Sequence, residues 1–350
     1  MKRLMIGAAG LALSLSTHAA LVDLTGKGYV TYGDFNSYSL PIAGLNVQSS
    51  PGQISDYVVI ATGADGNPVN TNFAGMDNAY STPTGESGSN YFTTGDTTDP
   101  GQVSDFSGDA DGTWDTSLSA LETFLDGESM VFFFNNNNLN GDNEQSLAGW
   151  AQVTIFDDMG DVVEIFDFTN NGGAYALVSE GGGGTFMGDP SGYTSDGSGP
   201  MVGDNNETDY VLSGGPICVD TDGAIPIPVS CGTEEADEGP FNHNLGQDTA
   251  AYAIVSPELN ALLEGLFGSG DDLSDYTMSV DLRLGCDPDF GMANDEICTG
   301  AESGYGKNIN NGYEQLFIAT AVLDEPMDIP EPGVLFLLGS GLLFLRWRSK

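Results

Sequence analysis

The residues of this chain that are best suited to chemistry are amide and acidic side chains next to glycine. Asn136, Asn138 and Asn140 alternate ahead of a glycine and Asp142 follows, which is the spacing with which an EF-hand calcium loop begins. The initial Asp is missing, and Leu147 stands where an EF-hand has its bidentate Glu. An asparagine-rich β-loop is the alternative interpretation. We treat the four polar side chains as candidate Ca²⁺ ligands.

Two shorter acidic segments have a similar composition. Asp109 and Asp111 precede one glycine, and Asp220 and Asp222 precede another. Carboxylate oxygens beside tight turns are the kind of ligand that Ca²⁺ prefers. The hypothesis is that one or more of these loops binds Ca²⁺ at the millimolar levels typical of extracellular modules.

Nucleophilic catalysis has weaker support. Ser87 lies in a glycine-rich segment, and His243 is the only histidine outside the N-terminal 19 residues. The two follow the opposite order to that of secreted proteases with a similar serine turn, and no G-x-S-x-G motif is present. Residues 241–246, around His243, could hold a sugar or a metal, or simply shape a loop. A carboxylate-based hydrolase stays open, because 51 acidic residues allow many pairs and single out none.

The four cysteines are Cys218, Cys231, Cys286 and Cys298. An even number in an exported chain predicts disulfides. Local pairing, Cys218 with Cys231 and Cys286 with Cys298, is favoured because each pair brackets a turn-rich segment. Each bond would close a loop of about a dozen residues, worth roughly 3 kcal/mol. Other pairings remain open, as does a zinc site, although no C-x-x-C spacing occurs.

The charge of the chain excludes some partners. It has 51 acidic and 8 basic residues, for a formal net charge of −43. Between residues 20 and 331 the basic residues are only Lys27, Arg283 and Lys307. Nucleic-acid binding needs clustered Lys and Arg and is excluded, and docking on an anionic lipid surface is disfavoured. The charge favours solubility and attraction to cations.

The N-terminus has the parts of a secretory signal peptide. Lys2 and Arg3 precede an apolar stretch over residues 4–15, and the small residues Thr17 and Ala19 follow. This order predicts export through the Sec translocon and cleavage by signal peptidase after Ala19. An uncleaved anchor helix is the alternative, although the apolar stretch is short for a span.

The C-terminus, residues 329–350, joins a proline-rich site, a short apolar helix predicted over 334–345 and a basic end. The residues that define the pattern are Pro330, Glu331, Pro332, Arg346 and Arg348. The pattern resembles a PEP-CTERM sorting signal, a class found in Gram-negative bacteria that make exopolysaccharide. The resemblance implies that an exosortase-like membrane protease removes the tail after transient membrane anchoring. A permanent C-terminal anchor is the alternative.

Several segments predict strands. Residues 150–156 and 161–168 flank an Asp/Gly turn, which indicates a hairpin. Residues 277–284 alternate between apolar and polar, which predicts a strand with one face in solvent. Further strands are expected at residues 56–60, 130–134 and 313–322.

Helices are expected to be few. One begins after the cap residue Ser256, with Pro257 at its first position and Gly268 at its end. The other is predicted over residues 115–125. Residues 62–113 and 180–209 show no periodicity and are expected to be polar loops.

These elements predict a mainly β fold: an antiparallel β-sandwich with a few short helices and long polar loops. The expected organisation is a signal peptide at 1–19, an acidic body at 20–328 and the sorting signal at 329–350. The loop at 180–209 is a candidate boundary within the body.

The predicted function is that of an exported, non-enzymatic protein of the cell surface or extracellular matrix, associated with exopolysaccharide. It is expected to cross the inner membrane and to reside in the envelope, at the surface or outside the cell. One alternative is a calcium-assisted carbohydrate-binding module, in which Trp114 and Trp150 could stack on sugars, although both would serve equally well in the core. The weaker alternative is the secreted carboxylate-based hydrolase.

Overall fold

The computed structural model describes the body of the chain with several gaps. The described residues are 21–49, 57–63, 69, 73–83, 91–95, 97–101, 106–137, 147–168, 211–213, 216–231, 234–285, 309 and 314–323. Among them, no helix is both long enough and apolar enough to cross a membrane.

The largest sheet in the described part of the chain has eight strands. Its order is β2-β3-β15-β8-β17-β4-β5, and β1 also pairs with β17. The pairs β1–β17 and β4–β5 are parallel, and the others are antiparallel. The strands are β1 (Leu21–Asp23), β2 (Tyr29–Tyr32), β3 (Phe35–Ser39), β4 (Val58–Thr62), β5 (Tyr80–Ser81), β8 (Ser129–Asn135), β15 (Tyr252–Val255) and β17 (Gln315–Val322).

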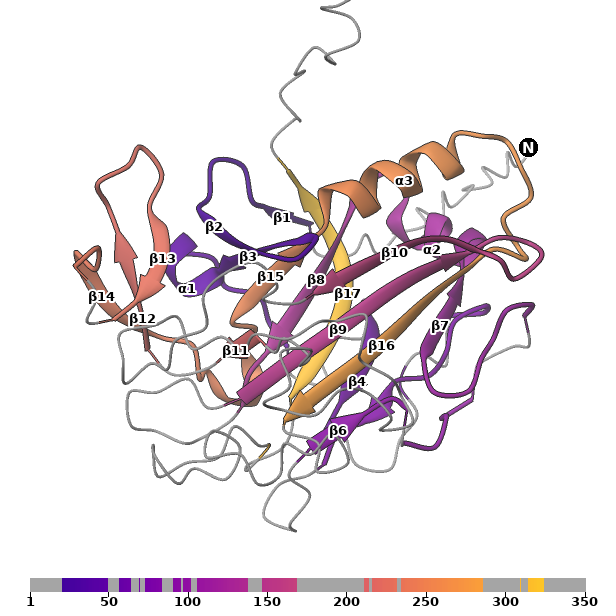
Figure 1. The fold of residues 1–350 in the computed structure, drawn as a ribbon, viewed down its shortest axis with the longest axis horizontal. Coiled ribbons are helices and arrows are strands. Elements are labelled where there is room, and N and C mark those ends of the chain that lie inside the picture. Colours follow the sequence, from indigo (N-terminus) through magenta and orange to yellow (C-terminus); the bar gives the residue numbers. More distant parts are fainter. Residues whose placement is uncertain are drawn as a thin grey trace, which may run out of the picture.

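A second, antiparallel sheet of six strands has the order β10-β9-β16-β6, with β11 beside β9 and β7 beside β16. A third sheet, β13-β12-β14, lies at one side of the molecule (Figure 1). The strands are β6 (Tyr91–Thr93), β7 (Trp114–Ser117), β9 (Leu147–Phe156), β10 (Val162–Phe168), β11 (Val211–Ser213), β12 (Pro216–Asp220), β13 (Ile227–Ser230), β14 (Glu238–Asn242) and β16 (Thr277–Gly285).

The two larger sheets share one hydrophobic core. Phe35 and Phe132 from the first sheet belong to the same buried cluster as Val153, Val280 and other residues of the second. Burial of these faces is the main source of stability for such a packing. The predicted mainly β, sandwich-like fold is confirmed.

The eight-stranded sheet is also buried on its other face. Val131 and Phe133 of β8 pack there with Phe317 of β17, beneath Leu40 and Val47. A strand that is buried on both faces needs no polar alternation. This explains why residues 130–134 read as a continuous apolar segment.

The predicted central hairpin is confirmed. Strands β9 and β10 pair in antiparallel register. The turn between them is closed by Asp157, whose Oδ1 accepts hydrogen bonds from the backbone N–H groups of Met159 and Asp161, both at 2.9 Å. An Asp that bonds to its own turn in this way favours the tight reversal.

The prediction of a solvated face on β16 is wrong. Thr277, Ser279 and Arg283 are buried, and only Asp281 is partly exposed. Loop residues cover this face: Thr277 Oγ1 donates to the carbonyl of Ser107 at 3.1 Å. The alternating sequence therefore identified the polar face of the strand correctly. That face is buried because loops cover it and form hydrogen bonds with it.

Three α-helices and one short 3₁₀ helix are present in the described residues: α1 (Leu40–Ala43), α2 (Leu118–Leu125), η4 (Gly246–Asp248) and α3 (Pro257–Phe267). Helix α3 confirms the prediction, and the Ser256 side chain accepts from the N–H of Leu259 at 3.1 Å. Helix α2 begins at Leu118 rather than Asp115, because residues 114–117 pair with β16 as β7. The prediction of its start was therefore wrong.

The third sheet carries a disulfide. Cys218 on β12 is bonded to Cys231, just after β13, with a Cα–Cα distance of 4.8 Å. This confirms one of the two predicted local pairs. The other pair, Cys286 and Cys298, lies outside the described residues, as do the signal peptide, the loop at 180–209 and the sorting signal.

Candidate metal centre

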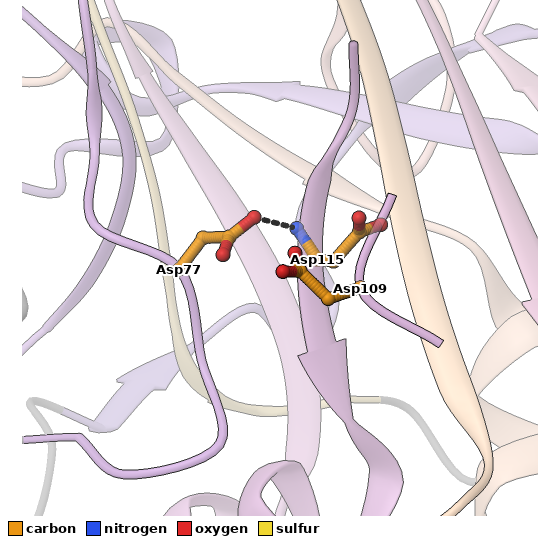
Figure 2. Close-up of side chains that lie close together, drawn as sticks. All are labelled: Asp77, Asp109 and Asp115. Carbon is orange, nitrogen blue, oxygen red and sulfur yellow. Dashed lines mark hydrogen bonds between the residues drawn. The ribbon is translucent and has the colours of Figure 1, made fainter. Parts of the chain in front are cut away.

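Three aspartates from separate segments meet at the edge of the six-stranded sheet. Asp77 precedes β5, Asp109 lies in the loop at 106–113, and Asp115 lies on β7. One carboxylate oxygen from each lies within 4.8 Å of the others (Figure 2). We call these three residues the core triad.

Backbone hydrogen bonds fix two members of the core triad against each other. The N–H of Asp77 donates to the carbonyl of Asp115 at 2.9 Å. The N–H of Asp115 donates to Oδ2 of Asp77 at 2.8 Å, the bond drawn in Figure 2. The neighbouring residues Met76 and Thr116 form an antiparallel bridge. The spacing of the two carboxylates is thus set by the sheet edge.

The loop that carries the third member, Asp109, is held against Asp115. Asp115 Oδ2 accepts from the N–H of Ala110 at 2.8 Å, and Asp115 Oδ1 accepts from Thr113 Oγ1 at 3.1 Å. Gly108 has φ +90°, and a Cβ there would lie 1.9 Å from Oγ1 of Thr277. Only glycine tolerates both the backbone angle and this approach. The residue before Asp109 therefore has to be small for the loop to reach the sheet.

Burial dominates the electrostatics of the core triad. Asp77 and Asp115 are both 0 % exposed, whereas Asp109 is exposed. Burial raises the pKa of Asp77 to about 8, the hydrogen bond from Asp115 opposes the rise, and the charges of Asp115, Asp109 and Asp99 add to it. Burial likewise raises the pKa of Asp115 to about 6, against the nearby Ser279 hydroxyl and the hydrogen bonds from Ala110 and Thr113. At neutral pH the core triad therefore retains a proton unless a cation replaces it.

Tyr80 packs next to the core triad. Its hydroxyl donates to the carbonyl of Thr113 at 2.9 Å. Burial raises the pKa of Tyr80, and the charges of Asp99, Asp77, Asp115 and Asp109 add to the effect. The phenol thus stays neutral and serves to anchor the loop.

A hollow of about 610 Å³ lies beside the core triad. Asp99, Asp111 and Asp281 contribute to its wall, together with Thr113, which bonds Asp115. Asp281 is itself paired with Arg283, whose Nη2 lies 3.0 Å from Oδ2. The surface next to the core triad is therefore acidic and hydroxyl-rich.

The donor set fits a hard divalent cation. Ca²⁺ takes six to eight oxygen ligands, and Mg²⁺ takes six. Three carboxylates would supply part of such a shell, and backbone carbonyls or water the remainder. A cation would also neutralise charge that the buried position otherwise disfavours.

A second group of three aspartates lies on the small sheet. Asp220, Asp222 and Asp237 also place one oxygen each within 4.8 Å of the others, but all three are partly or fully exposed. Asp237 Oδ2 accepts from the N–H and the hydroxyl of Thr221, at 2.8 and 3.0 Å. We call these three residues the hairpin triad.

The predicted acidic loops therefore contribute to both groups. Asp109 belongs to the core triad, and Asp220 and Asp222 belong to the hairpin triad. Sequence reasoning missed Asp77, Asp115 and Asp237. Asp77 lies in a segment without periodicity, and Asp115 had been placed at the start of a helix.

The asparagine-rich candidate is only partly described. Asn136 is buried, and Asn138, Asn140 and Asp142 lie outside the described residues. Calcium binding at these four side chains remains a prediction.

The other candidate residues have clear positions where they are described. Trp114 and Trp150 are buried, so of the two roles that the sequence left open the structure supports the core position and not sugar stacking. His243 is also buried and bonds to Ser39 rather than facing solvent. Ser87 and the sorting residues Pro330 to Pro332, with Arg346 and Arg348, lie outside the described residues.

Comparison with known families gives one match. The model for DUF8239, a domain of unknown function, matches residues 21–283. The chain belongs to the DUF8239 family. Both triads lie within the matched DUF8239 region. No curated protein and no solved structure matches the chain.

Proposed function

We propose that this chain is an exported, non-enzymatic protein of the cell surface or extracellular matrix. The observation that carries this proposal is the Cys218–Cys231 disulfide. Disulfides form and persist in oxidising compartments outside the cytoplasm. The acidic body, which favours solubility and repulsion between copies, supports the same location.

The two ends of the sequence supply the route. Export uses the Sec translocon and signal peptidase, and an exosortase-like membrane protease then removes the tail at Pro330–Pro332. The C-terminal helix anchors the chain in the membrane only until that cleavage. The released body then resides with exopolysaccharide.

The intact mass of the protein recovered from its own host, with and without reductant, tests this route. We expect a product that begins near Ala20 and ends near Pro332. Reduction should add two hydrogens for Cys218–Cys231 and two more if Cys286 and Cys298 are also bonded. A product that retains both ends would contradict export and sorting.

A second function is favoured by the core triad: binding of a divalent cation, with Ca²⁺ as the expected ion. Two carboxylates with no solvent exposure converge on a third, and the charges of Asp115, Asp109 and one further acid, Asp99, act on Asp77. Both carboxylate oxygens of Asp115 and one of Asp77 already accept hydrogen bonds that hold the loop and strand. These fixed carboxylates suit ion binding better than the acid–base roles of a hydrolase.

Calcium bound at the core triad would also affect the hollow beside it. A cation at the core triad would fix the loop at 106–113, which contributes Asp111 and Thr113 to the wall of the hollow. Carboxylates and hydroxyls are good partners for sugar hydroxyl groups. We propose this hollow, rather than the buried tryptophans, as the place for calcium-assisted carbohydrate binding.

Thermal unfolding in Ca²⁺ and in EDTA tests the second function. We expect Ca²⁺ to raise the melting temperature of the wild type and of Asp222→Asn, but not that of Asp109→Asn. Asp109 is exposed, so its replacement removes a ligand with little effect on folding. An equal response of all three proteins, or no response of the wild type, would refute the core triad as the site.

A further inference from the structure

Ser39 and His243 form a buried hydrogen-bonded pair, although 204 residues separate them in the sequence. Ser39 is the last residue of β3 and His243 directly follows β14. Ser39 Oγ lies 2.5 Å from Nε2 of His243, and the side chains are 3 % and 0 % exposed. Tyr252 packs against the imidazole, with ring centroids 5.1 Å apart.

The hydrogen bonds determine where the protons lie. His243 Nδ1 is 3.0 Å from the carbonyl of Phe241, which can only accept, so Nδ1 carries the proton. Burial lowers the pKa of His243 to about 4, so the ring is neutral at pH 7. Nε2 then has a lone pair and accepts the proton of Ser39 Oγ. This is the arrangement of a nucleophile, a base and a group that orients the base.

The hydroxyl oxygen is also held from its other side. Ser39 Oγ accepts from the N–H of Ile42 at 3.2 Å. With its proton directed to Nε2 and one lone pair used by this N–H, the hydroxyl has a fixed orientation. A second lone pair remains for attack.

Ser39 contributes to the wall of an apolar cavity between the sheets. Phe35, Ser37 and Ser39 alternate along β3, share one face of the strand, and all line this cavity. Its volume is about 90 Å³, several times what one water molecule needs. The remaining lining residues are mainly apolar, among them Phe134, Val153 and Leu284. Such a space favours an apolar group over water.

We infer that Ser39 is an acyl-accepting nucleophile, that His243 is its general base, and that the cavity takes the acyl group of a small apolar ester. This inference departs from the non-enzymatic part of the proposed function, whereas the proposed surface location does not depend on it. It places reactive chemistry at the cavity between the sheets, and no aspartate of either triad is among the residues that line this cavity.

The reaction balances with water as the only co-substrate. Ser39 Oγ bonds to the ester carbonyl carbon while its proton passes to His243 Nε2. The ester C–O bond breaks, and the leaving alcohol takes that proton, which leaves an acyl-serine. Water then attacks the acyl carbon, gives a proton to Nε2, and releases the carboxylic acid as the proton returns to Ser39.

Labelling with diisopropyl fluorophosphate tests the inference. Ser39 Oγ would bond to phosphorus, fluoride would leave, and the hydroxyl proton would pass through His243 Nε2 to solvent. We expect one adduct per chain by intact mass, located at Ser39 by peptide mapping. Complete absence of an adduct, under conditions that fully label a known serine esterase, would overturn the inference. An adduct at another residue would overturn it equally.

Variants separate reactivity from structure. Ser256→Ala is the matched control, because Ser256 caps helix α3 through its hydroxyl as Ser39 caps α1, but it does not line the cavity and should leave labelling unchanged. Ser39→Ala should abolish labelling, with circular dichroism to confirm folding, since it also removes the cap of α1. His243→Gln retains a hydrogen-bonding amide but no base, and should slow labelling at least 100-fold. Labelling of His243→Gln at the wild-type rate would exclude His243 as the base.

Discussion

The core triad and the hairpin triad each bring three carboxylates within the same distance, but they differ in burial and in support. The core triad lies at the edge of the large sandwich, with two members fully buried and fixed by strand and loop hydrogen bonds. The hairpin triad lies on the small sheet, where the nearby disulfide joins Cys218 of β12 to Cys231, the residue after β13. Its members are accessible to water.

This difference shows that proximity of acids is not enough to define a site. Exposed carboxylates can be stabilised by water and by screening ions, so their convergence demands no particular ligand. Buried carboxylates lack that solvation, and the structure must supply a proton or a cation. The core triad is therefore the better candidate for specific ion binding.

The largest effect is expected where the support is covalent. Replacing Cys218 and Cys231 together by Ser should lower the free energy of unfolding by about 3 kcal/mol, because the disulfide closes a short loop. Denaturant unfolding measures the change. The Ca²⁺ affinity of the core triad should stay the same, and a parallel loss of that affinity would show that the two regions are coupled.

Asp115→Ala should have the next largest effect. It removes the acceptor for the N–H of Ala110 and the hydroxyl of Thr113, so we expect a loss of about 2 kcal/mol in the free energy of unfolding. Asp222→Ala, in the hairpin triad, should change it by about 0.5 kcal/mol or less. Equal losses measured by urea unfolding would remove the structural contrast between the triads.

The pH dependence of stability should expose Asp77. Its folded-state pKa of about 8 lies above the ordinary value of 3.8, so the folded state binds the extra proton between these limits. The stabilisation is complete below about pH 4 and is lost as pH rises through 8. In EDTA, the free energy of unfolding of Asp77→Asn relative to that of the wild type should therefore rise by roughly 1–2 kcal/mol between pH 5 and pH 9. Parallel curves for the two proteins would contradict the raised pKa.

Calcium should give the smallest change in stability. At a concentration about tenfold above its Kd, Ca²⁺ should add about 1.4 kcal/mol to the free energy of unfolding. The gain should be larger at pH 8 than at pH 5, because protons compete for the same carboxylates. Calorimetric melting at the two pH values measures both gains. A larger gain at pH 5 would contradict competition between protons and Ca²⁺ for the core triad.

The sequence predicted the sheets better than the site. Long apolar or alternating segments such as 150–168 and 313–322 identify their strands, because burial imposes those patterns. Asp115 was assigned to a helix because three leucines that follow it have helical spacing. The pairing of residues 114–117 with β16 overrides that start, and this pairing is tertiary.

The partners in each polar cluster are distant in sequence, which hides them from pattern analysis. Asp77 and Asp115 are 38 residues apart. Asp220 and Asp222 stand out beside a glycine, but Asp237 joins them only because β14 returns alongside β12. Ser39 has no sequence feature that connects it to His243.

Isothermal titration with Ca²⁺ at pH 7.5, on the wild type, Asp109→Asn and Asp222→Asn, tests the central claim most directly. We expect one site in the wild type, with proton release seen as a dependence of the heat on the buffer. That site should be absent in Asp109→Asn and unchanged in Asp222→Asn. Binding that persists in Asp109→Asn and disappears in Asp222→Asn would place the cation at the hairpin triad and contradict the account.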